Sequence, residues 1–276
     1  MADELCVTVP DVTGVAAADL LSLTGRCALV TGAAMGLGRA IAERLAEAGA
    51  RVAVADIAKE QAESVAGELR AKHGVDAMSC ELDVRKPAQI SEAIAAVAER
   101  FGGLDIHINN AGIYPLSPVL EMPDEQWDDV IAINLSGAFF ASREAARAMV
   151  KQGRGGVIIN ISSTSGVNGG GVSIPHYAAS KHGVIGLTRQ MALEFAPHGI
   201  RTLAVAPNVI VTEGVRHAKE KTVAAAGFEL DVEKSLLGRA GVPDDVARVV
   251  LFAASDMAAF MTGSTLFVDA GSTARG

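Results

Sequence analysis

The sequence predicts a single α/β domain in which a doubly wound, seven-stranded parallel sheet carries helices on both faces. Two observations predict this class. Short apolar runs of strand length alternate along the chain with longer segments of helical character. Most of the runs are continuously apolar, which is typical of parallel strands that are buried on both faces of the sheet.

This alternation assigns the elements in order. The predicted strands are residues 27–30, 52–55, 77–82, 106–108, 157–161, 202–206 and 265–268. The predicted helices are residues 39–48, 60–72, 90–100, 124–150, 177–195 and 244–254. Because strand and helix alternate, we expect one domain of parallel βαβ units over residues 23–276. Residues 1–22 are expected to form a tail that packs on the surface or on a neighbouring subunit, and the charged segment 212–238 a substrate lid.

The composition excludes several classes of protein. Half of the residues are hydrophobic and a fifth are charged, as in a globular protein with a large core. With a net charge of −8 the chain repels nucleic acid and anionic membranes, and neither is an expected partner. The N-terminal residues lack the basic start of a signal peptide and no apolar run has membrane-spanning length, so we expect a cytoplasmic protein. The three cysteines and six histidines show no zinc-ligand spacing, so no metal site is expected.

A glycine-rich motif follows the first predicted strand. The motif TGAAMGLG spans residues 31–38, and Gly32, Gly36 and Gly38 follow the spacing GxxxGxG before a predicted helix. Glycines let the backbone approach a pyrophosphate, and the helix N-terminus offers unpaired N–H groups and a partial positive charge. This context indicates a dinucleotide-binding turn, and a tight turn without a ligand is the alternative.

Asp56 indicates which dinucleotide binds. A carboxylate about 20 residues past the glycines accepts hydrogen bonds from the adenosine ribose hydroxyls, and Asp56 ends the second predicted strand at about that distance. It would repel a 2′-phosphate, and the glycine turn has no Arg or Lys to offset that repulsion, since Met35 precedes Gly36. The sequence therefore favours NAD. The alternative is a solvated or helix-capping aspartate.

Tyr177 and Lys181 lie four residues apart in a predicted helix, so both are on one face. A nearby cation lowers the pKa of a phenol, and a phenol tuned in this way takes a proton from an alcohol or gives one to a ketone. An exposed Tyr–Lys pair is the alternative for this spacing alone. Two neighbouring motifs favour catalysis, because Ser162 and Ser163 end one predicted strand and residues 109–112 follow another, at the edge where doubly wound folds place chemistry.

In this order the motifs resemble the short-chain dehydrogenase/reductase family of Rossmann-fold proteins, in the branch of NAD-dependent alcohol dehydrogenases and 3-ketoacyl reductases. The resemblance covers about residues 23–271. Asn134 belongs to it, although a mid-helix Asn that bonds a neighbouring carbonyl is an alternative for this residue alone. The matching pieces are TGAAMGLG, Asp56, Asp83 and Val84, NNAG at 109–112, Asn134, ISS at 161–163, YAASK at 177–181, Pro207 to Thr212 and the ending at 262–271.

The resemblance implies four catalytic roles. Tyr177 is implied to be the acid/base, and Lys181 to lower its pKa and to bind the nicotinamide ribose. Ser163 is implied to hydrogen-bond the substrate oxygen. Asn134 is implied to hold a water that links Lys181 to solvent, which completes a proton relay.

The resemblance also implies a cofactor-binding set. Asp83 and Val84 are expected to contact adenine, and Ile210 and Thr212 to face the nicotinamide carboxamide. Asn110 and the backbone after it are expected to line the ribose and support the glycine turn. The full set is Gly32, Met35, Gly36, Leu37, Gly38, Asp56, Ile57, Asp83, Val84, Asn110, Ala111, Gly112, Tyr177, Lys181, Pro207, Ile210 and Thr212.

Three departures from the family pattern bear on the site. Asn208 replaces the usual Gly after Pro207. Because Asn tolerates positive φ better than other non-glycine residues, we expect the turn to be kept. The alternative is that Asn208 changes the shape of the nicotinamide pocket. Ala270 replaces a Gly near the C-terminus. The spacing from Ser163 to Tyr177 is one residue longer than usual, which leaves Ser162 or Thr164 as alternative working hydroxyls behind Ser163.

The expected substrate pocket is mainly apolar, which favours a hydrophobic or cyclic secondary alcohol or ketone over a highly charged substrate. For His176, a surface position just before the helix is favoured over a substrate contact. The candidate substrate contacts are Tyr114, Thr164, Val172, His176 and Val215.

Three functions stay open. An NAD-dependent alcohol dehydrogenase is favoured. An NADPH-dependent 3-ketoacyl carrier-protein reductase is second, with Asp56, Met35 and the acidic balance against it. A non-catalytic cofactor sensor is third, with the intact catalytic set against it. We expect a homotetramer that assembles through the apolar faces of helices 124–150 and 177–195.

Overall fold

The computed structural model describes residues 10–169, 171–212 and 235–275. It confirms a single sheet of seven strands in the order β3-β2-β1-β4-β5-β6-β7, and every neighbouring pair is parallel. Since the strand order reverses between β1 and β4, the ligand crevice of a doubly wound sheet is expected there. The strands are β1 Cys27–Thr31, β2 Arg51–Asp56, β3 Ala77–Glu81, β4 Ile106–Asn109, β5 Gly156–Ile161, β6 Ile200–Pro207 and β7 Thr265–Val268.

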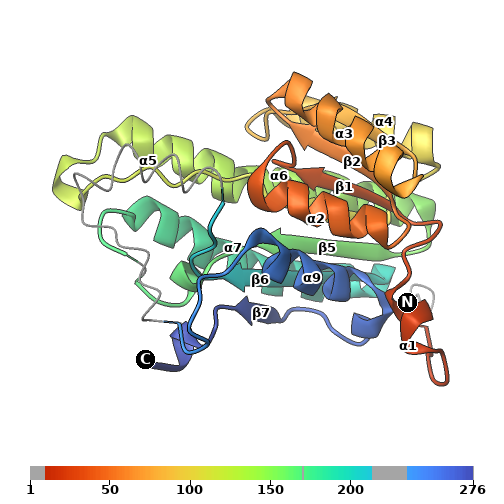
Figure 1. The fold of residues 1–276 in the computed structure, drawn as a ribbon. Helices are drawn as coiled ribbons and strands as arrows, with labels where there is room; N and C mark the ends of the chain where they lie inside the picture. Colours follow the sequence, from red (N-terminus) through yellow and green to blue (C-terminus); the bar gives the residue numbers. More distant parts are fainter. Residues whose placement is uncertain (1–9, 170, 213–234, 276) are drawn as a thin grey trace, which may run out of the picture.

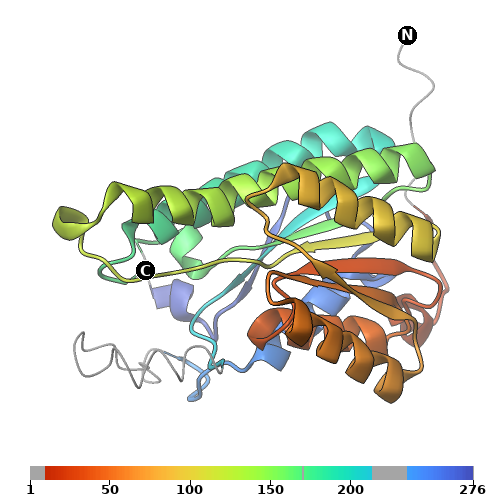
Figure 2. The ribbon, with the colours of Figure 1, turned by 90° about the horizontal axis from the view of Figure 1, so that it is seen from above.

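Helices cover both faces of the sheet. Figures 1 and 2 show α2, α3 and α9 on one face and α4, α6 and α7 on the other. The carboxyl ends of the strands lie at one edge, toward which the arrowheads of β5 and β7 point in Figure 1. The helices are α1 Ala17–Leu21, α2 Gly36–Glu47, α3 Lys59–His73, α4 Pro87–Phe101, α5 Asp124–Ile131, α6 Ala138–Gln152, α7 Pro175–Phe195 and α9 Pro243–Ala254.

The two helical layers explain why the strands are continuously apolar. In β1 the side chain of Leu29 belongs to the core under α4 and α6, whereas its neighbour Val30 belongs to the core under α2, α3 and α9. Both are at most 1% exposed. Because successive side chains of a strand point to opposite faces, a strand between two helical layers needs apolar residues at every position.

The helix boundaries follow local chemistry, and α2, α4 and α7 begin two or three residues before the predicted starts. Proline occupies the first turn of α4, α7 and α9, and glycines in the left-handed conformation end α3, α4 and α6. The predicted helix 39–48 begins three residues earlier, so Gly36 and Gly38 both lie in the first turn of α2. The predicted helix 124–150 is divided into α5 and α6 by the π-helical segment Ala132–Gly137.

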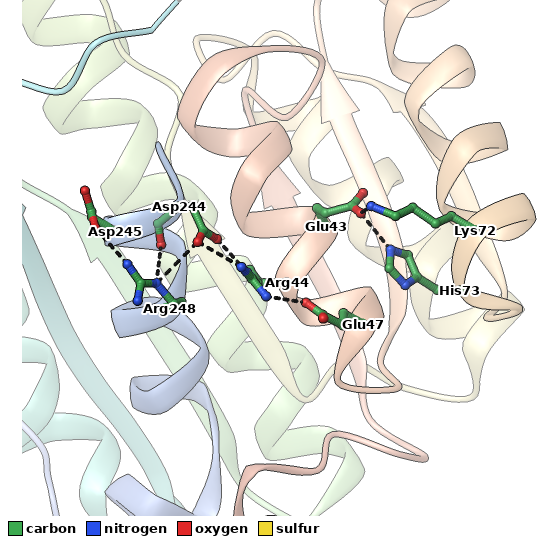
Figure 3. Close-up of polar contacts among 8 residues, drawn as sticks. All are labelled: Glu43, Arg44, Glu47, Lys72, His73, Asp244, Asp245 and Arg248. Atoms are coloured by element: carbon green, nitrogen blue, oxygen red, sulfur yellow. Dashed lines mark hydrogen bonds and ion pairs between the residues drawn. The ribbon is translucent and has the colours of Figure 1, made fainter. Parts of the chain in front are cut away.

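Ion pairs join α2 to its neighbours on the outer face of the domain (Figure 3). Arg44 in α2 binds both carboxylate oxygens of Asp244 in α9, at 2.5 and 2.8 Å. Glu43 in α2 contacts Lys72 and His73 at the end of α3. Since these side chains are partly exposed, each pair contributes less than about 1 kcal/mol. Their effect is to fix how the three helices pack against one another.

Parts of the predicted tail and lid fall within the described residues. Helix α1, in the predicted tail, packs on the turn Asp256–Ala258 of the same chain. The predicted lid 212–238 lies largely outside the described residues. Over the ranges that the structure describes, no helix has both the length and the apolarity needed to cross a bilayer.

Candidate active site

The glycine turn between β1 and α2 is packed too tightly to admit side chains. Gly32 has φ +63°, and a Cβ atom there would lie 2.9 Å from the Cα of Ala111. A Cβ at Gly38 would overlap the carbonyl oxygen of Gly32 and lie 2.5 Å from Nδ2 of Asn110. The bare backbone at the start of α2 therefore fits a pyrophosphate group, which binds to N–H groups at a helix N-terminus.

Thr31 and Asn110 hold this turn in place. The Thr31 hydroxyl accepts hydrogen bonds from the backbone N–H groups of Asn110 and Ala111, at 3.0 and 3.1 Å. Nδ2 of Asn110 donates to the carbonyl oxygens of Thr31 and Gly32, both at 2.9 Å. No role for Thr31 was predicted from the sequence. Its available signal was a hydroxyl at the last position of an otherwise apolar strand.

Asp56 lies beside the glycine turn. Its carboxylate accepts hydrogen bonds from the backbone N–H groups of Ala34, within the turn, and Ala58, both at 3.0 Å. Met35 and Ile57 are 54% and 68% exposed, so uncharged side chains flank this corner. No Lys or Arg side chain among the described residues is hydrogen-bonded to Asp56.

The expected adenine side carries a second acidic residue that is already paired. Arg85 donates from Nε and Nη2 to the carboxylate of Asp83, at 3.0 and 2.8 Å. These bonds hold the pKa of Asp83 below its usual range. The neighbouring Val84 is buried against Gly137, where a Cβ would lie 2.9 Å from a Val84 methyl.

Ser163, Tyr177 and Lys181 come together at the carboxyl ends of the strands. Ser163 follows β5, and the other two lie near the start of α7. Burial raises the pKa of the Tyr177 phenol above its ordinary value, the hydrogen bond with Ser163 acts to lower it, and Tyr114 adds to the rise. Nζ of Lys181 lies 5.5 Å from the centroid of the Tyr177 ring.

Lys181 is almost completely enclosed. Its side chain donates from Nζ to the carbonyl oxygen of Ile161 at 2.7 Å, and the residue is 5% exposed. Burial disfavours the ammonium ion and lowers its pKa from 10.5 to about 8. The lysine is thus still mostly charged at neutral pH, but with its protonation equilibrium close to the working range.

Three adjacent hydroxyl groups were candidates for the substrate oxygen, and they have different partners. The Ser162 hydroxyl donates to the carbonyl oxygen of Lys181 at 3.0 Å, which ties β5 to α7. The Thr164 hydroxyl donates to Oδ1 of Asn208 at 3.3 Å. Ser163 is the one of the three that acts on Tyr177, whose pKa it lowers, and its hydroxyl also accepts from the N–H of Ser165 at 3.1 Å.

Asn134 lies in the π-helical segment and bonds across to another loop. Its Oδ1 accepts from the N–H of Ile113 and its Nδ2 donates to the carbonyl oxygen of Ile113, both at 2.9 Å. Nδ2 also lies 3.3 Å from the Ser180 hydroxyl in α7. Asn134 therefore does bond a carbonyl oxygen, but this carbonyl belongs to the loop after β4 and not to a neighbour along the helix. These two hydrogen bonds fix the position of Ile113, the residue that precedes Tyr114.

The candidate substrate residues Tyr114, Val172 and Val215 do not lie in one place. The Tyr114 ring meets Tyr177 edge to face, with centroids 6.0 Å apart and an interplanar angle of 70°. Val172 is 90% exposed at the rim of the site, in a loop joined to the Tyr114 loop by the bond from Ser117 N–H to the Ser173 carbonyl, at 2.8 Å. Val215 lies outside the described residues.

His176 is not a surface residue, so that expectation was wrong. It is 0% exposed, its Nδ1 accepts from the N–H of Tyr177 at 2.8 Å, and its Nε2 lies 3.0 Å from Nε2 of Gln126 in α5. Burial lowers its pKa. The physical reason is that α7 begins at Pro175, so His176 is in the first turn and packs against α5.

The departure at Asn208 also has a different explanation from the one expected. The non-glycine residues with positive φ in the described part of the chain are Ser173 and Ala270, at 67° and 47°. Asn208 therefore does not need the freedom of glycine, and its amide instead receives the Thr164 hydroxyl. Ala270 is the position that takes up the left-handed conformation.

The segment after β6 runs back toward the glycine turn. Pro207 ends β6 and pairs with Val268 of β7. Ile210 is 9% exposed and bridges to Gly241. A Cβ placed on Gly36 would lie 3.7 Å from the Thr212 side chain, so Thr212 lies near the glycine turn.

Comparison with known proteins agrees with this architecture. A family profile described as enoyl-(acyl carrier protein) reductase matches residues 32–273. The 3-oxoacyl-[acyl-carrier-protein] reductase FabG of Aquifex aeolicus is 38% identical over 251 residues, which cover 91% of this chain and 98% of that protein. The L-rhamnose 1-dehydrogenase (NAD(P)(+)) of Azotobacter vinelandii is 39% identical over 253 residues, which cover 90% and 97%. A short-chain type dehydrogenase/reductase from Mycobacterium marinum has a TM-score of 0.85 at 38% identity, with coverage of 92% and 98%.

The fold and the comparisons together define an oxidoreductase that acts on a CH–OH or C=O group. The chain belongs to the short-chain dehydrogenase/reductase family, as its motifs indicate.

Proposed function

We propose that this protein interconverts a secondary alcohol and a ketone with NAD(H), using Ser163, Tyr177 and Lys181 as its reacting groups. The observation that carries the proposal is the meeting of a half-buried phenol, a buried hydroxyl and a buried ammonium group at the strand edge that also holds the glycine turn. The nicotinamide supplies hydride transfer when it is bound. The chain supplies orientation and a path for the proton.

The proton path follows from the contacts. When the alcohol is oxidised, its carbinol C–H bond gives up a hydride and its O–H bond gives a proton to the Tyr177 oxygen. We assign to the Ser163 hydroxyl a hydrogen bond to the same substrate oxygen. Burial opposes the phenolate of Tyr177, and the Lys181 cation over its ring favours it. We assign to Asn134 the water that links Lys181 to solvent.

The geometry around Asp56 favours NAD over NADP. The carboxylate is held at the glycine turn by two backbone N–H groups, and its neighbours Met35 and Ile57 are uncharged. Arg39, which follows the glycine turn, is paired with Glu68, and Lys59, three residues after Asp56, is paired with Glu81. A 2′-phosphate at this corner would meet a negative charge without compensation.

Replacing that charge tests the choice of cofactor. In the double variant Asp56→Ala with Ile57→Arg, we expect the ratio of kcat/KM for NADP over NAD to rise at least about tenfold, because repulsion is removed and a cation is added. The single variant Ile57→Arg is the control for the added cation. Wild-type protein that already prefers NADP would show that Asp56 does not select the cofactor.

A hydrophobic or cyclic substrate is favoured by the side chains at the mouth of the site. Tyr114, Val167 and Val172 are 47%, 40% and 90% exposed there. The second candidate, an NADPH-dependent 3-ketoacyl carrier-protein reductase, is favoured by the similarity to the Aquifex aeolicus reductase. The acidic corner at Asp56 argues against it. A non-catalytic cofactor sensor would not need the intact catalytic set.

One assay separates these functions. Reduced nicotinamide is followed by absorbance with NAD or NADP and 1-phenylethanol, cyclohexanol or 2-octanol, and in reverse with NADPH and an acetoacetyl thioester. Oxidation of an alcohol with NAD supports the proposal. Activity confined to NADPH and the thioester would replace it with the second candidate, and tight NADH binding without turnover of any substrate would favour the sensor.

We further propose a cytoplasmic homotetramer. Phe139 in α6 and Leu193 in α7 are 38% and 74% exposed, and these helices lie side by side on one face (Figure 2). A second copy would bury such side chains. The free, buried thiols of Cys27 and Cys80 suit a reducing compartment. Light scattering during size-exclusion chromatography tests the assembly, and a mass of one chain would contradict it.

A further inference from the structure

A chain of buried polar side chains runs beneath the site. It begins at His107 in β4, which is 0% exposed and faces the α4 and α6 layer together with its register neighbours Leu29 and Ile158. Nε2 of His107 lies 3.0 Å from Oδ1 of Asn109. Nδ2 of Asn109 donates to Oδ1 of Asn160 in β5 at 2.8 Å.

The chain continues into α7. Nδ2 of Asn160 donates to the Thr188 hydroxyl at 2.9 Å, and that hydroxyl donates to the Val184 carbonyl oxygen at 2.8 Å. Nδ2 of Asn109 also donates to the Ser142 hydroxyl in α6 at 2.8 Å. All of these polar residues are at most 7% exposed. The network therefore connects the two strands and the two helices around which the site is built.

The hydrogen bonds all run in one direction. The amide nitrogen of Asn109 donates to Asn160 and Ser142, and that of Asn160 donates to Thr188 in α7. Oδ1 of Asn109 therefore needs a donor on the other side, and His107 supplies it from Nε2. Consecutive bonds with the same direction polarise one another and strengthen the chain. An apolar residue at position 107 would leave a buried acceptor without a partner, and the Asn109 amide would no longer have one preferred orientation.

We propose that His107 is a positioning residue for the reaction, which sets the location of the catalytic helix α7 on β5 through Asn109, Asn160 and Thr188. The chain ends at Val184, one helical turn after Lys181, and Thr188 lies on the same face of α7 as Lys181. Two further bonds hold α7 to the end of β5: Lys181 Nζ donates to the carbonyl oxygen of Ile161, the residue after Asn160, and the Ser162 hydroxyl donates to the carbonyl oxygen of Lys181. The inference rests on the proposed roles of Tyr177 and Lys181.

The test is a kinetic double-mutant cycle between His107 and Thr188, which do not touch each other because Asn109 and Asn160 lie between them in the chain of hydrogen bonds. His107→Leu and Thr188→Val break the chain at opposite ends, so each is expected to lower kcat about tenfold with little change in KM. The double variant is expected to be no slower than about the slower single variant, because the chain is already broken. His107→Gln, which keeps an N–H donor, is expected to recover most of the activity, and Ile158→Val is the control for disturbing the same layer.

The outcomes separate this inference from the proposed function. The positioning role would be overturned if the effects of the two single variants multiplied, or if His107→Gln were as slow as His107→Leu. In either case a slow Tyr177→Phe variant would leave the proposed function standing. A fully active Tyr177→Phe would overturn the proposed function itself, and this inference with it. The assay uses the full chain, NAD and the alcohol of the panel that is oxidised fastest.

Discussion

Lys181 holds a positive charge in a place that is unfavourable for it. Its ammonium group is buried, and Ile161 provides a single carbonyl oxygen to receive it. Burial lowers the pKa to about 8, so the folded state binds this proton less tightly than the unfolded chain does. The residue is therefore expected to be kept for chemistry at a cost in stability.

Lys181→Met is expected to abolish turnover and to raise the free energy of unfolding by about 1–2 kcal/mol at pH 7. Between pH 8 and 10.5 the unfolded chain holds more protons than the folded one, so wild-type stability rises with pH and the difference from the variant closes. Urea unfolding at pH 7 and pH 10 measures this. A variant less stable than wild type at both values would contradict the account.

The types of site residue were predictable, whereas their partners were not. The hydroxyl, phenol and ammonium groups at the strand edge were identified from spacing. Which of Ser162, Ser163 and Thr164 meets Tyr177 depends on how α7 lies on β5, and that is a tertiary contact. His176 was misplaced for the same reason, since its burial depends on where α7 begins and on its packing against α5.

At the scale of elements, the turn from β1 to α2 is the part of the site with the least tolerance. Gly38 faces the carbonyl of Gly32 and the amide of Asn110, so the strand end, the helix start and the loop after β4 meet at one point. A helical glycine in an open position offers a comparison. A Cβ on Gly67 in α3 would meet only the end of the Arg70 side chain, at 3.6 Å.

Gly38→Ala is expected to weaken NADH binding at least about tenfold and to lower stability by about 1–3 kcal/mol, because backbone atoms must move. The matched variant Gly67→Ala is expected to leave binding unchanged and to raise stability by about 0.5–1 kcal/mol. Fluorescence titration with NADH and thermal unfolding measure both. Equal NADH affinity in the two variants would show that the tight turn is not part of the cofactor site.

The sequence pattern was sufficient to predict the strands and the number of helices in the two layers, but not the π-helical segment. The π-helical segment Ala132–Gly137 is only 6 residues long and lies between two α-helices, so apolar periodicity could not reveal it. It accompanies contacts with distant segments. Asn134 bonds to Ile113, and Gly137 packs on Val84.

At the scale of the whole molecule, the sheet order follows from rules of connection that the sequence satisfies. The buried polar network that crosses the centre of the sheet does not follow from these rules. His107 interrupts an apolar strand, and nothing in its neighbours along the chain indicates that Asn160 and Thr188 complete a path for it. Nδ1 of His107 has no hydrogen-bond partner among the described residues.

Folding keeps His107 neutral, which makes the protein sensitive to acid. Burial lowers its pKa from 6.5 to about 4, so the unfolded chain binds more protons in that window. We expect the free energy of unfolding to fall as the pH decreases from 6.5 to 4, with His107 accounting for about 3 kcal/mol of the loss. Urea unfolding across this range, in wild type and His107→Leu, measures it.

The variant isolates His107 from other groups. His176 also has a lowered pKa and contributes in both proteins, and carboxylates such as Asp83 and Asp244 lose their stabilising charge only at lower pH. The stability of His107→Leu is therefore expected to depend less steeply on pH between 6.5 and 4. Parallel curves for the two proteins would mean that His107 is not held neutral by the fold.

In the proposed reaction, Tyr177 accepts the proton of an alcohol whose hydride goes to NAD. The most direct test is the initial rate of NAD reduction by Tyr177→Phe beside wild type, with NADH affinity measured on the same samples. The account predicts that kcat falls by about 10²- to 10⁴-fold while NADH affinity stays within about threefold. A variant that oxidises the alcohol as fast as wild type would contradict it.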